Sequence, residues 1–151
     1  MKEPATSKAR LQSVALEMTL PATLRSVAQF IEFIKRNLEE IGCPSKVSTK
    51  LAVIVDEIAS NIVKYAYGSS TGDMTVQLVV ESDEPAVQIA FIDEGVTFDP
   101  LEAFQIDSAK AIESRRIGGQ GILITKAFAD EVEYERQDNK NILRIRKRIG
   151  C

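Results

Sequence analysis

The chain contains no histidine, and only two of its 151 residues are cysteine. Without histidine there can be no histidine-based metal site, no Ser-His-Asp or Cys-His catalysis and no phosphohistidine on this chain. Cys43 and Cys151 form no C-x-x-C pair, so we interpret them as two reduced thiols. Any chemistry must therefore use carboxylates, amides, basic side chains and backbone N–H groups.

Strong net charge and long hydrophobic runs are also absent. A formal net charge of −3 gives no basic surface for nucleic acid or an anionic membrane as the main partner. No apolar run approaches the length that spans a bilayer, and the first ten residues, MKEPATSKAR, lack the apolar core of a signal peptide. We therefore predict a cytoplasmic protein, with no direct membrane or nucleic-acid partner.

The composition is otherwise that of an ordinary globular protein, with 44% hydrophobic and 27% charged residues. A chain of 151 residues can bury one full hydrophobic core but is short for two. We expect a flexible N terminus over residues 1–12 and a single domain over residues 13–151.

Hydrophobic periodicity predicts eight secondary-structure elements. We expect a strand over residues 14–20, a helix from Pro21 to about Ile41, a helix capped by Ser45 or Ser48 and ended by Gly68, strands over 74–80 and 86–92, a buried helix over 121–129, and strands over 132–136 and 142–148. The order β-α-α-β-β-α-β-β has hairpins but no β-α-β alternation. It predicts an α+β fold, a two-layer sandwich with helices on one face of a mixed, largely antiparallel sheet.

The second predicted helix carries two polar residues one turn apart, Glu57 and Asn61. At about 100° per residue they lie side by side at the border of the apolar arc, rather than on the opposite, solvent face. An asparagine amide can supply one oxygen ligand to Mg²⁺, and the glutamate could orient or deprotonate an attacking hydroxyl. The alternative is an ordinary solvated carboxylate and amide, and the border position weighs against it.

Asp93 follows directly after the predicted strand 86–92, in the triplet Asp93-Glu94-Gly95. A carboxylate only accepts hydrogen bonds, so at a strand end it can accept a hydrogen bond from the exocyclic amine of adenine. Gly95 leaves room for a base to approach the backbone. Taken alone, the triplet is equally explained as a turn after a strand.

Three glycines, Gly118, Gly119 and Gly121, open the predicted helix over residues 121–129. Backbone N–H groups and the positive end of a helix dipole favour phosphate at such a position. No G-K-[ST] follows, so this is no Walker motif, and no dinucleotide-type strand precedes it, so a Rossmann site is excluded. Arg115 and Arg116 could reach a γ-phosphate, although a charged pair in a loop is often only solvated.

These motifs, in this order, resemble those of the GHKL ATPase superfamily, and most closely its bacterial anti-sigma factor serine kinases. EIASNIVKYAYG (57–68) is similar to their N-box, DEGVTFDP (93–100) to their first glycine box, and GGQGILITKAFADEV (118–132) to their second. The resemblance covers residues 15–148 and implies the Bergerat sandwich. It departs at two positions: Tyr65 replaces a common N-box histidine, and Gln29 replaces a basic residue that some members use for partner contact.

The resemblance also implies a role for each site residue. Glu57 would be the catalytic base, Asn61 the Mg²⁺ ligand and Asp93 the adenine contact, and residues 99–117 would form a lid over ATP. Phosphate and lid contacts would come from Gly95, Arg116, Gly118, Gly119 and Gly121.

The family implies a cytoplasmic homodimer that binds a sigma factor and phosphorylates a serine of its antagonist protein, using ATP and Mg²⁺. Two alternatives remain open from the sequence. One is a non-catalytic ATP- or ADP-binding module that regulates a partner. The other is the catalytic domain of a histidine kinase, which would need a separate acceptor protein because this chain has no histidine.

Overall fold

The computed structural model describes residues 14–67, 71–81, 85–97 and 119–149. The elements are β1 (Val14–Pro21), α2 (Leu24–Glu40), α3 (Ser45–Tyr65), β2 (Asp73–Glu81), β3 (Ala86–Asp93), α6 (Gly119–Phe128), β4 (Glu131–Gln137) and β5 (Lys140–Arg148). The predicted order of strands and helices is therefore confirmed. The predicted N-terminal segment, the whole predicted lid over residues 99–117, Gly68, Arg116 and Gly118 lie outside the described residues.

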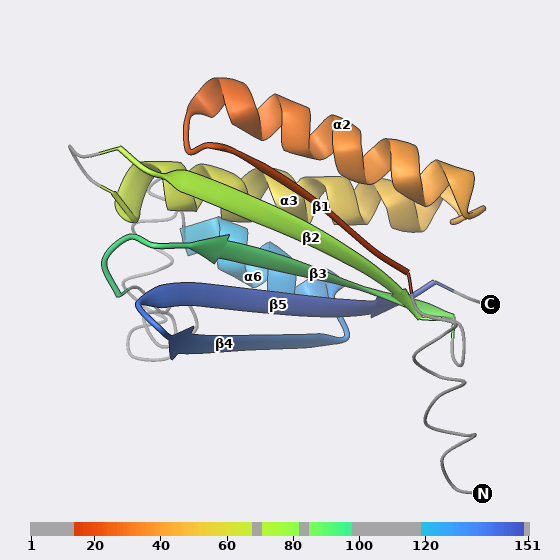
Figure 1. Cartoon of the computed structure of the whole chain (residues 1–151). Helices are drawn as coiled ribbons and strands as arrows, with labels where there is room; N and C mark the ends of the chain where they lie inside the picture. The colour runs from red at the N-terminus through yellow and green to blue at the C-terminus, as the bar shows by residue number, and fades with distance from the viewer. Residues whose placement is uncertain (1–13, 68–70, 82–84, 98–118, 150–151) are drawn as a thin grey trace, which may run out of the picture.

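The five strands form one sheet in the order β1-β2-β3-β5-β4, and every described pair is antiparallel. All three described helices cover the same face of this sheet (Figure 1). Helix α3 is the central helix, because it packs against both α2 and α6. The predicted two-layer α+β sandwich is confirmed.

The hydrophobic core lies between the two layers. Helix α2 contributes Val27, Phe30, Ile34 and Leu38, which recur at helical spacing. Alternate residues of the strands face the helices, as period-2 patterning requires. The buried residues on this inner face of the sheet are Met74, Val76, Leu78, Val87, Ile89, Phe91, Leu143 and Ile145.

The starts of the first two helices differ from the prediction, whereas the end of α2 agrees with it. Pro21 is the last residue of β1 and not the first turn of a helix; Thr23 caps α2, its hydroxyl accepting the Ser26 N–H at 3.2 Å. The helix ends at Glu40, and the φ of +79° at Gly42 suits the left-handed turn that closes its last carbonyls. The residue before α3 is Pro44, and it makes no side-chain capping bond, so the predicted serine cap is wrong.

Strands β4 and β5 are joined by a two-residue turn, Asp138-Asn139, in which both residues have positive φ. Aspartate and asparagine tolerate this conformation, which is typical of type I′ hairpins. The resulting register aligns Arg136 of β4 with Asn141 of β5, and Asn141 in turn with Asp93 of β3. A row of polar side chains therefore crosses three strands at one end of the sheet.

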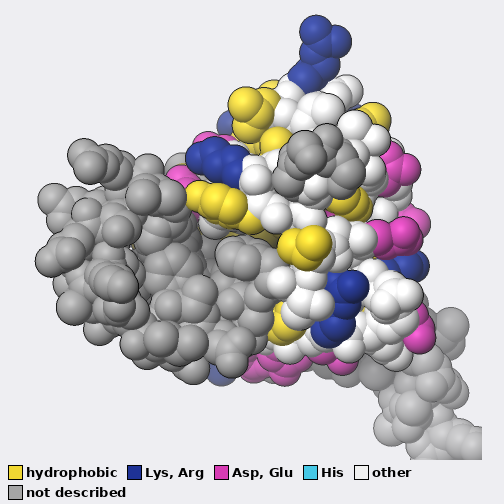
Figure 2. All heavy atoms as spheres, turned by 90° about the vertical axis from the view of Figure 1, so that its left-hand side faces the viewer, with side chains coloured by type: hydrophobic (Ala, Val, Ile, Leu, Met, Phe, Trp, Pro, Cys, Tyr) yellow, Lys and Arg dark blue, Asp and Glu magenta, His cyan; other side chains and the backbone are white. Residues whose placement is uncertain are grey.

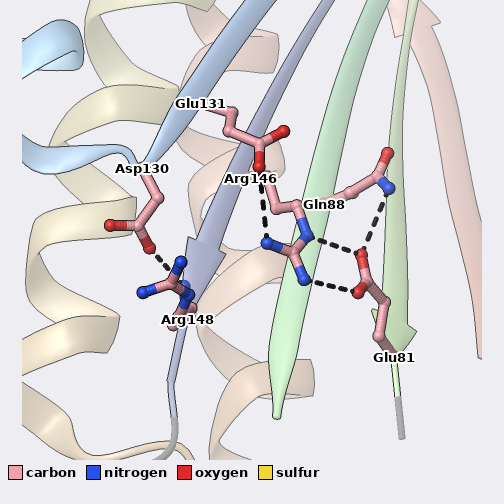
Figure 3. A network of polar contacts seen from close by, with 6 residues as sticks. All are labelled: Glu81, Gln88, Asp130, Glu131, Arg146 and Arg148. Carbon is pink, nitrogen blue, oxygen red and sulfur yellow. Dashed lines mark hydrogen bonds and ion pairs between the residues drawn. The ribbon is translucent and has the colours of Figure 1, made fainter. Parts of the chain in front are cut away.

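The face of the sheet that points away from the helices carries a cross-strand polar network (Figure 3). Arg146 of β5 donates two hydrogen bonds to Glu81 of β2, at 3.1 and 2.9 Å, and lies 3.6 Å from Glu131 of β4. Gln88 of β3 also donates to Glu81. The Arg146 hydrogen bond holds the pKa of Glu81 below its usual value. Although β5 is rich in basic residues, the Arg146 side chain is only 17% exposed and does not simply point to water.

Candidate functional site

The three motifs identified in the sequence meet at one end of the molecule. Strand β3 ends there, at Asp93, and α3 ends beside it. Helix α6 runs antiparallel to α3 and begins at the same end (Figure 1). The fold thus brings together an acidic strand end, the end of the helix with Glu57 and Asn61, and a helix N-terminus.

The carboxylate of Asp93 is buried, with only 3% of the residue exposed. One of its oxygens, Oδ1, accepts two hydrogen bonds: from the N–H of Gly95 at 2.8 Å and from Asn141 Nδ2 at 2.9 Å. Burial raises the pKa of Asp93, while the bonds from Asn141 and Gly95 and the nearby Arg136 oppose that rise. Among the residues that the structure describes, both bonds end on Oδ1, so the other oxygen can accept a donor from a ligand.

Asn141 is itself held on both sides of its amide. Its Nδ2 also donates to the carbonyl of Val96 at 2.8 Å, and its Oδ1 accepts from the hydroxyl of Tyr134. Arg136 adds a bond to the same loop, from Nη1 to the carbonyl of Gly95 at 2.8 Å. The β4–β5 hairpin therefore fixes the loop that follows Asp93.

Gly95 allows this loop to lie against the end of α3. The N–H of Val96 donates to the carbonyl of Ala66 at 2.8 Å. A Cβ on Gly95 would lie only 2.2 Å from that same carbonyl oxygen, so only glycine fits here without a backbone shift. The sequence explained Gly95 by the approach of a base, and the structure adds close packing against α3.

Tyr67 fastens the same loop from the other side. Its hydroxyl accepts the N–H of Glu94 at 2.8 Å and donates to the carbonyl of Asp73 at 2.6 Å. Its ring fills the space in which a Cβ on Gly72 would lie, 2.1 Å from the nearest ring atom. The chain after α3, the start of β2 and the end of β3 are thus joined by one side chain.

Glu57 and Asn61 lie, half-buried, on the flank of α3 that faces α6. Lys50 identifies this flank, because its Nζ lies 5.3 Å from the centre of the Phe128 ring of α6. At about 100° per residue, positions 57 and 61 lie within about 20° of Lys50 around the helix axis. Both polar side chains therefore border the space between α3 and α6.

Helix α6 begins at Gly119, and Gly121 lies in its first turn, as predicted. The N–H groups of this turn have no partner within an α-helix, which makes the position suitable for phosphate. Further along α6, Thr125 is buried whereas Lys126 and Ala127 are exposed. Residues 124–128 of α6 are therefore covered on one side only, whereas the sequence predicted a buried helix.

Figure 2 views this end of the molecule and shows hydrophobic side chains exposed among basic and uncharged ones. Val96, next to Gly95, is 64% exposed, and Tyr65 is 37% exposed. Apolar surface beside a carboxylate acceptor suits the flat face and polar edge of a nucleobase.

A hollow of about 700 Å³ opens on the outer face of the sheet and reaches Tyr67, Asp93 and Glu94 at the end of β3. Its walls include Thr19, Thr75 and Ile92, whose side chains alternate with inward-facing neighbours, and Lys140 at the rim. Neither Glu57 nor Asn61 lines this hollow, so it shares Asp93 with the candidate site but lies outside the space between α3 and α6.

Sequence reasoning did not identify Asn141, Tyr134, Arg136 or Tyr67 as site residues. Asn141 gave a usable signal: in the strand N-I-L-R-I-R it falls on the same face as the core residues Leu143 and Ile145. A polar residue at an inward position calls for a buried partner. The role of Tyr67 depends on contacts with the start of β2 and with Glu94, 27 residues away, and no local pattern encodes the second contact.

The family description "Histidine kinase-like ATPase domain" matches residues 20–147. The chain is 25% identical over 134 residues to the serine/threonine-protein kinase BtrW of Bordetella bronchiseptica, covering 86% of this chain and 89% of that protein. It is 27% identical over 126 residues to the Anti-sigma F factor of Thermoanaerobacter sp., covering 82% and 81%.

Among solved structures, the fold is similar to that of the RsbU and RsbW domains of a Mycobacterium tuberculosis protein. The TM-score is 0.66 at 18% identity, over 90% of this chain and 32% of that one. Within the described residues, no helix is both long and apolar enough to span a membrane. From the match over residues 20–147, the chain belongs to the family of histidine kinase-like ATPase domains.

Proposed function

We propose that this protein is an ATP-dependent protein serine kinase that controls a transcription factor by exchanging partners. The observation that carries the proposal is the end of the fold at which Asp93, the α6 flank of α3 and the start of α6 meet. Names of relatives, a serine/threonine-protein kinase and an Anti-sigma F factor, point to the same activity.

Each group in this arrangement has a distinct task. Asp93 accepts a hydrogen bond from the exocyclic amine of adenine, and Val96 offers apolar surface beside the base. The N–H groups of the first turn of α6, with Gly118, Gly119 and Gly121, receive phosphate oxygens. Arg116 would neutralise charge on the γ-phosphate.

Glu57 is the base in this proposal. It accepts the proton of a serine hydroxyl as the serine oxygen bonds to the γ-phosphorus, while the bond from that phosphorus to the bridging oxygen breaks and ADP leaves. Because such reactions are promoted mainly by positioning and charge, a carboxylate fixed on a helix is well suited. The half-buried position of Glu57 on α3 shelters it from water.

The residues present also fit Mg²⁺. A half-buried amide at Asn61, one helical turn from Glu57, offers a neutral oxygen to a cation whose other ligands come from phosphates and water. When bound, Mg²⁺ would neutralise charge on the phosphates. We propose Asn61 as its protein ligand.

The partners follow from the family. We propose a sigma factor as the bound partner, an antagonist protein carrying the phosphorylated serine, a homodimer as the working unit and the cytoplasm as its location. Sedimentation of the purified protein with and without ATP and Mg²⁺ would measure the oligomeric state.

The decisive test of function is phosphoryl transfer. Tagged protein would be incubated with lysate of its source, ATP and Mg²⁺, and retained proteins would be examined for phosphoserine by mass spectrometry. Glu57→Gln removes the base, and Asp56→Asn is a matched control, since Asp56 is exposed on the same helix.

A small protein that gains phosphoserine with wild type and Asp56→Asn, but not with Glu57→Gln, supports the proposal. Nucleotide-dependent retention without phosphoserine would instead assign the chain to the non-catalytic binding modules.

A further inference from the structure

The amide of Asn141 is oriented by its surroundings. Its Nδ2 faces two groups that only accept, Asp93 Oδ1 at 2.9 Å and the Val96 carbonyl at 2.8 Å. Its Oδ1 faces the hydroxyl of Tyr134. Reversing the amide would place an acceptor opposite both acceptors, so this chain of bonds has one direction.

The direction of these bonds makes Asp93 Oδ1 a hydrogen-bond acceptor. Since Asn141 donates to Oδ1, and the Gly95 N–H donates to the same atom, the carboxylate is held as an acceptor and its rotation is restricted. These two donated bonds stabilise the ionised form of Asp93, in which the remaining oxygen meets a ligand as a hydrogen-bond acceptor. Both residues are buried, at 3% and 5% exposure, so water competes poorly for these bonds.

We propose that Asn141, held by Tyr134, is a positioning and specificity-determining residue of the nucleotide site, which makes Asp93 select a base that presents an amino group over one that presents a carbonyl oxygen. This inference rests on the proposed nucleotide-binding function. Asn141 acts through Asp93 and does not touch the reacting phosphate.

The adenine–hypoxanthine pair tests this proposal, because these bases differ at the amino position. Adenine presents N–H to an acceptor, whereas hypoxanthine presents an oxygen, which a fixed carboxylate oxygen repels. Calorimetric titrations would compare ATP with ITP for wild type, Asn141→Ala and Tyr134→Phe. Gln77→Ala, on the outer face of β2, is the control, because its amide contacts Glu17 and lies away from the site.

We expect wild type and Gln77→Ala to prefer ATP over ITP by roughly 100-fold or more. In Asn141→Ala the ATP affinity should fall roughly 10- to 100-fold while the ITP affinity changes little, so the preference collapses. Tyr134→Phe removes only one oxygen and should reduce the preference in the same sense, by roughly three- to tenfold.

A merely structural role for Asn141 would weaken both nucleotides equally. An unchanged ATP-to-ITP ratio in folded Asn141→Ala would therefore overturn the inference; if that variant does not fold, an unchanged ratio in Tyr134→Phe would do so. Failure of wild type to bind either nucleotide would instead refute the proposed function.

Discussion

The Asp93→Asn variant separates two effects of this carboxylate, its contribution to ATP affinity and its effect on the free energy of unfolding. The substitution keeps the shape of the side chain and keeps an oxygen at the Oδ1 position, where Gly95 and Asn141 donate at 2.8 and 2.9 Å. It places an NH₂ group at the other position, where the ligand amine also donates. A charge-assisted bond is thus replaced by two opposed donors.

Loss of that bond should weaken ATP binding by about 2 to 3 kcal/mol, which is roughly a 30- to 140-fold rise in Kd. The stability of the free protein should change in a different way. Burial raises the pKa of Asp93, so its contribution to stability is present below the pKa of an unfolded aspartate and is lost as pH rises through the folded pKa.

When Asp93 is ionised, the folded wild type bears the cost of a buried charge, and the Asp93→Asn variant does not. Weaker neutral hydrogen bonds offset part of this relief, so the free energy of unfolding should remain within about 1 kcal/mol of wild type. Calorimetry for ATP and denaturant titration for stability measure the two effects, with exposed Asp73→Asn as the control.

Wild-type ATP affinity in the Asp93→Asn variant would refute the placement of the base. A large loss of stability would refute the idea that Asp93 is retained for binding at some cost to the fold.

Three further predictions concern the surroundings of Asp93. Gly95→Ala would place a Cβ 2.2 Å from the Ala66 carbonyl, so it should destabilise the fold by about 1 to 3 kcal/mol in denaturant titration; an unchanged midpoint would contradict this packing. Tyr67→Phe removes the hydroxyl that is bonded to Glu94 and Asp73, so native-state hydrogen exchange at the Glu94 amide should become faster. An exchange rate equal to that of wild type would contradict a role of Tyr67 in holding this loop. Adenosine affinity should fall as pH drops through the raised pKa of Asp93, which is faced by Arg136 from β4, Tyr67 after α3 and the adjacent Glu94. Adenosine has no phosphate to titrate, and the same pH dependence in the Asp93→Asn variant would assign the titration to another group.

Hydrophobic periodicity predicted the elements and their order because it reflects burial, which local sequence encodes directly. Helix ends were less predictable. Pro21 fits either the first turn of a helix or the end of an edge strand, and pairing with Asp73 of β2 decides for the strand. Pro44 replaces the expected serine cap because the first turn of α3 begins directly after it.

The candidate site was predictable only where one segment carries the chemistry. The pair Glu57 and Asn61 follows from helical spacing alone. The bonds from Asn141 to Asp93 and Val96 join residues more than forty positions apart in sequence, through the register of β3 and β5. Such contacts depend on the assembled sheet, so patterning reveals the polar residue but not its partner.

The most direct measurement of the central claim is a crystal structure with Mg²⁺ and a non-hydrolysable ATP analogue. We predict the adenine amine on the free oxygen of Asp93, Mg²⁺ on Asn61 and Glu57 turned toward the terminal phosphate. A nucleotide bound instead in the hollow between Thr19, Thr75 and Lys140, on the outer face of the sheet, would contradict the account.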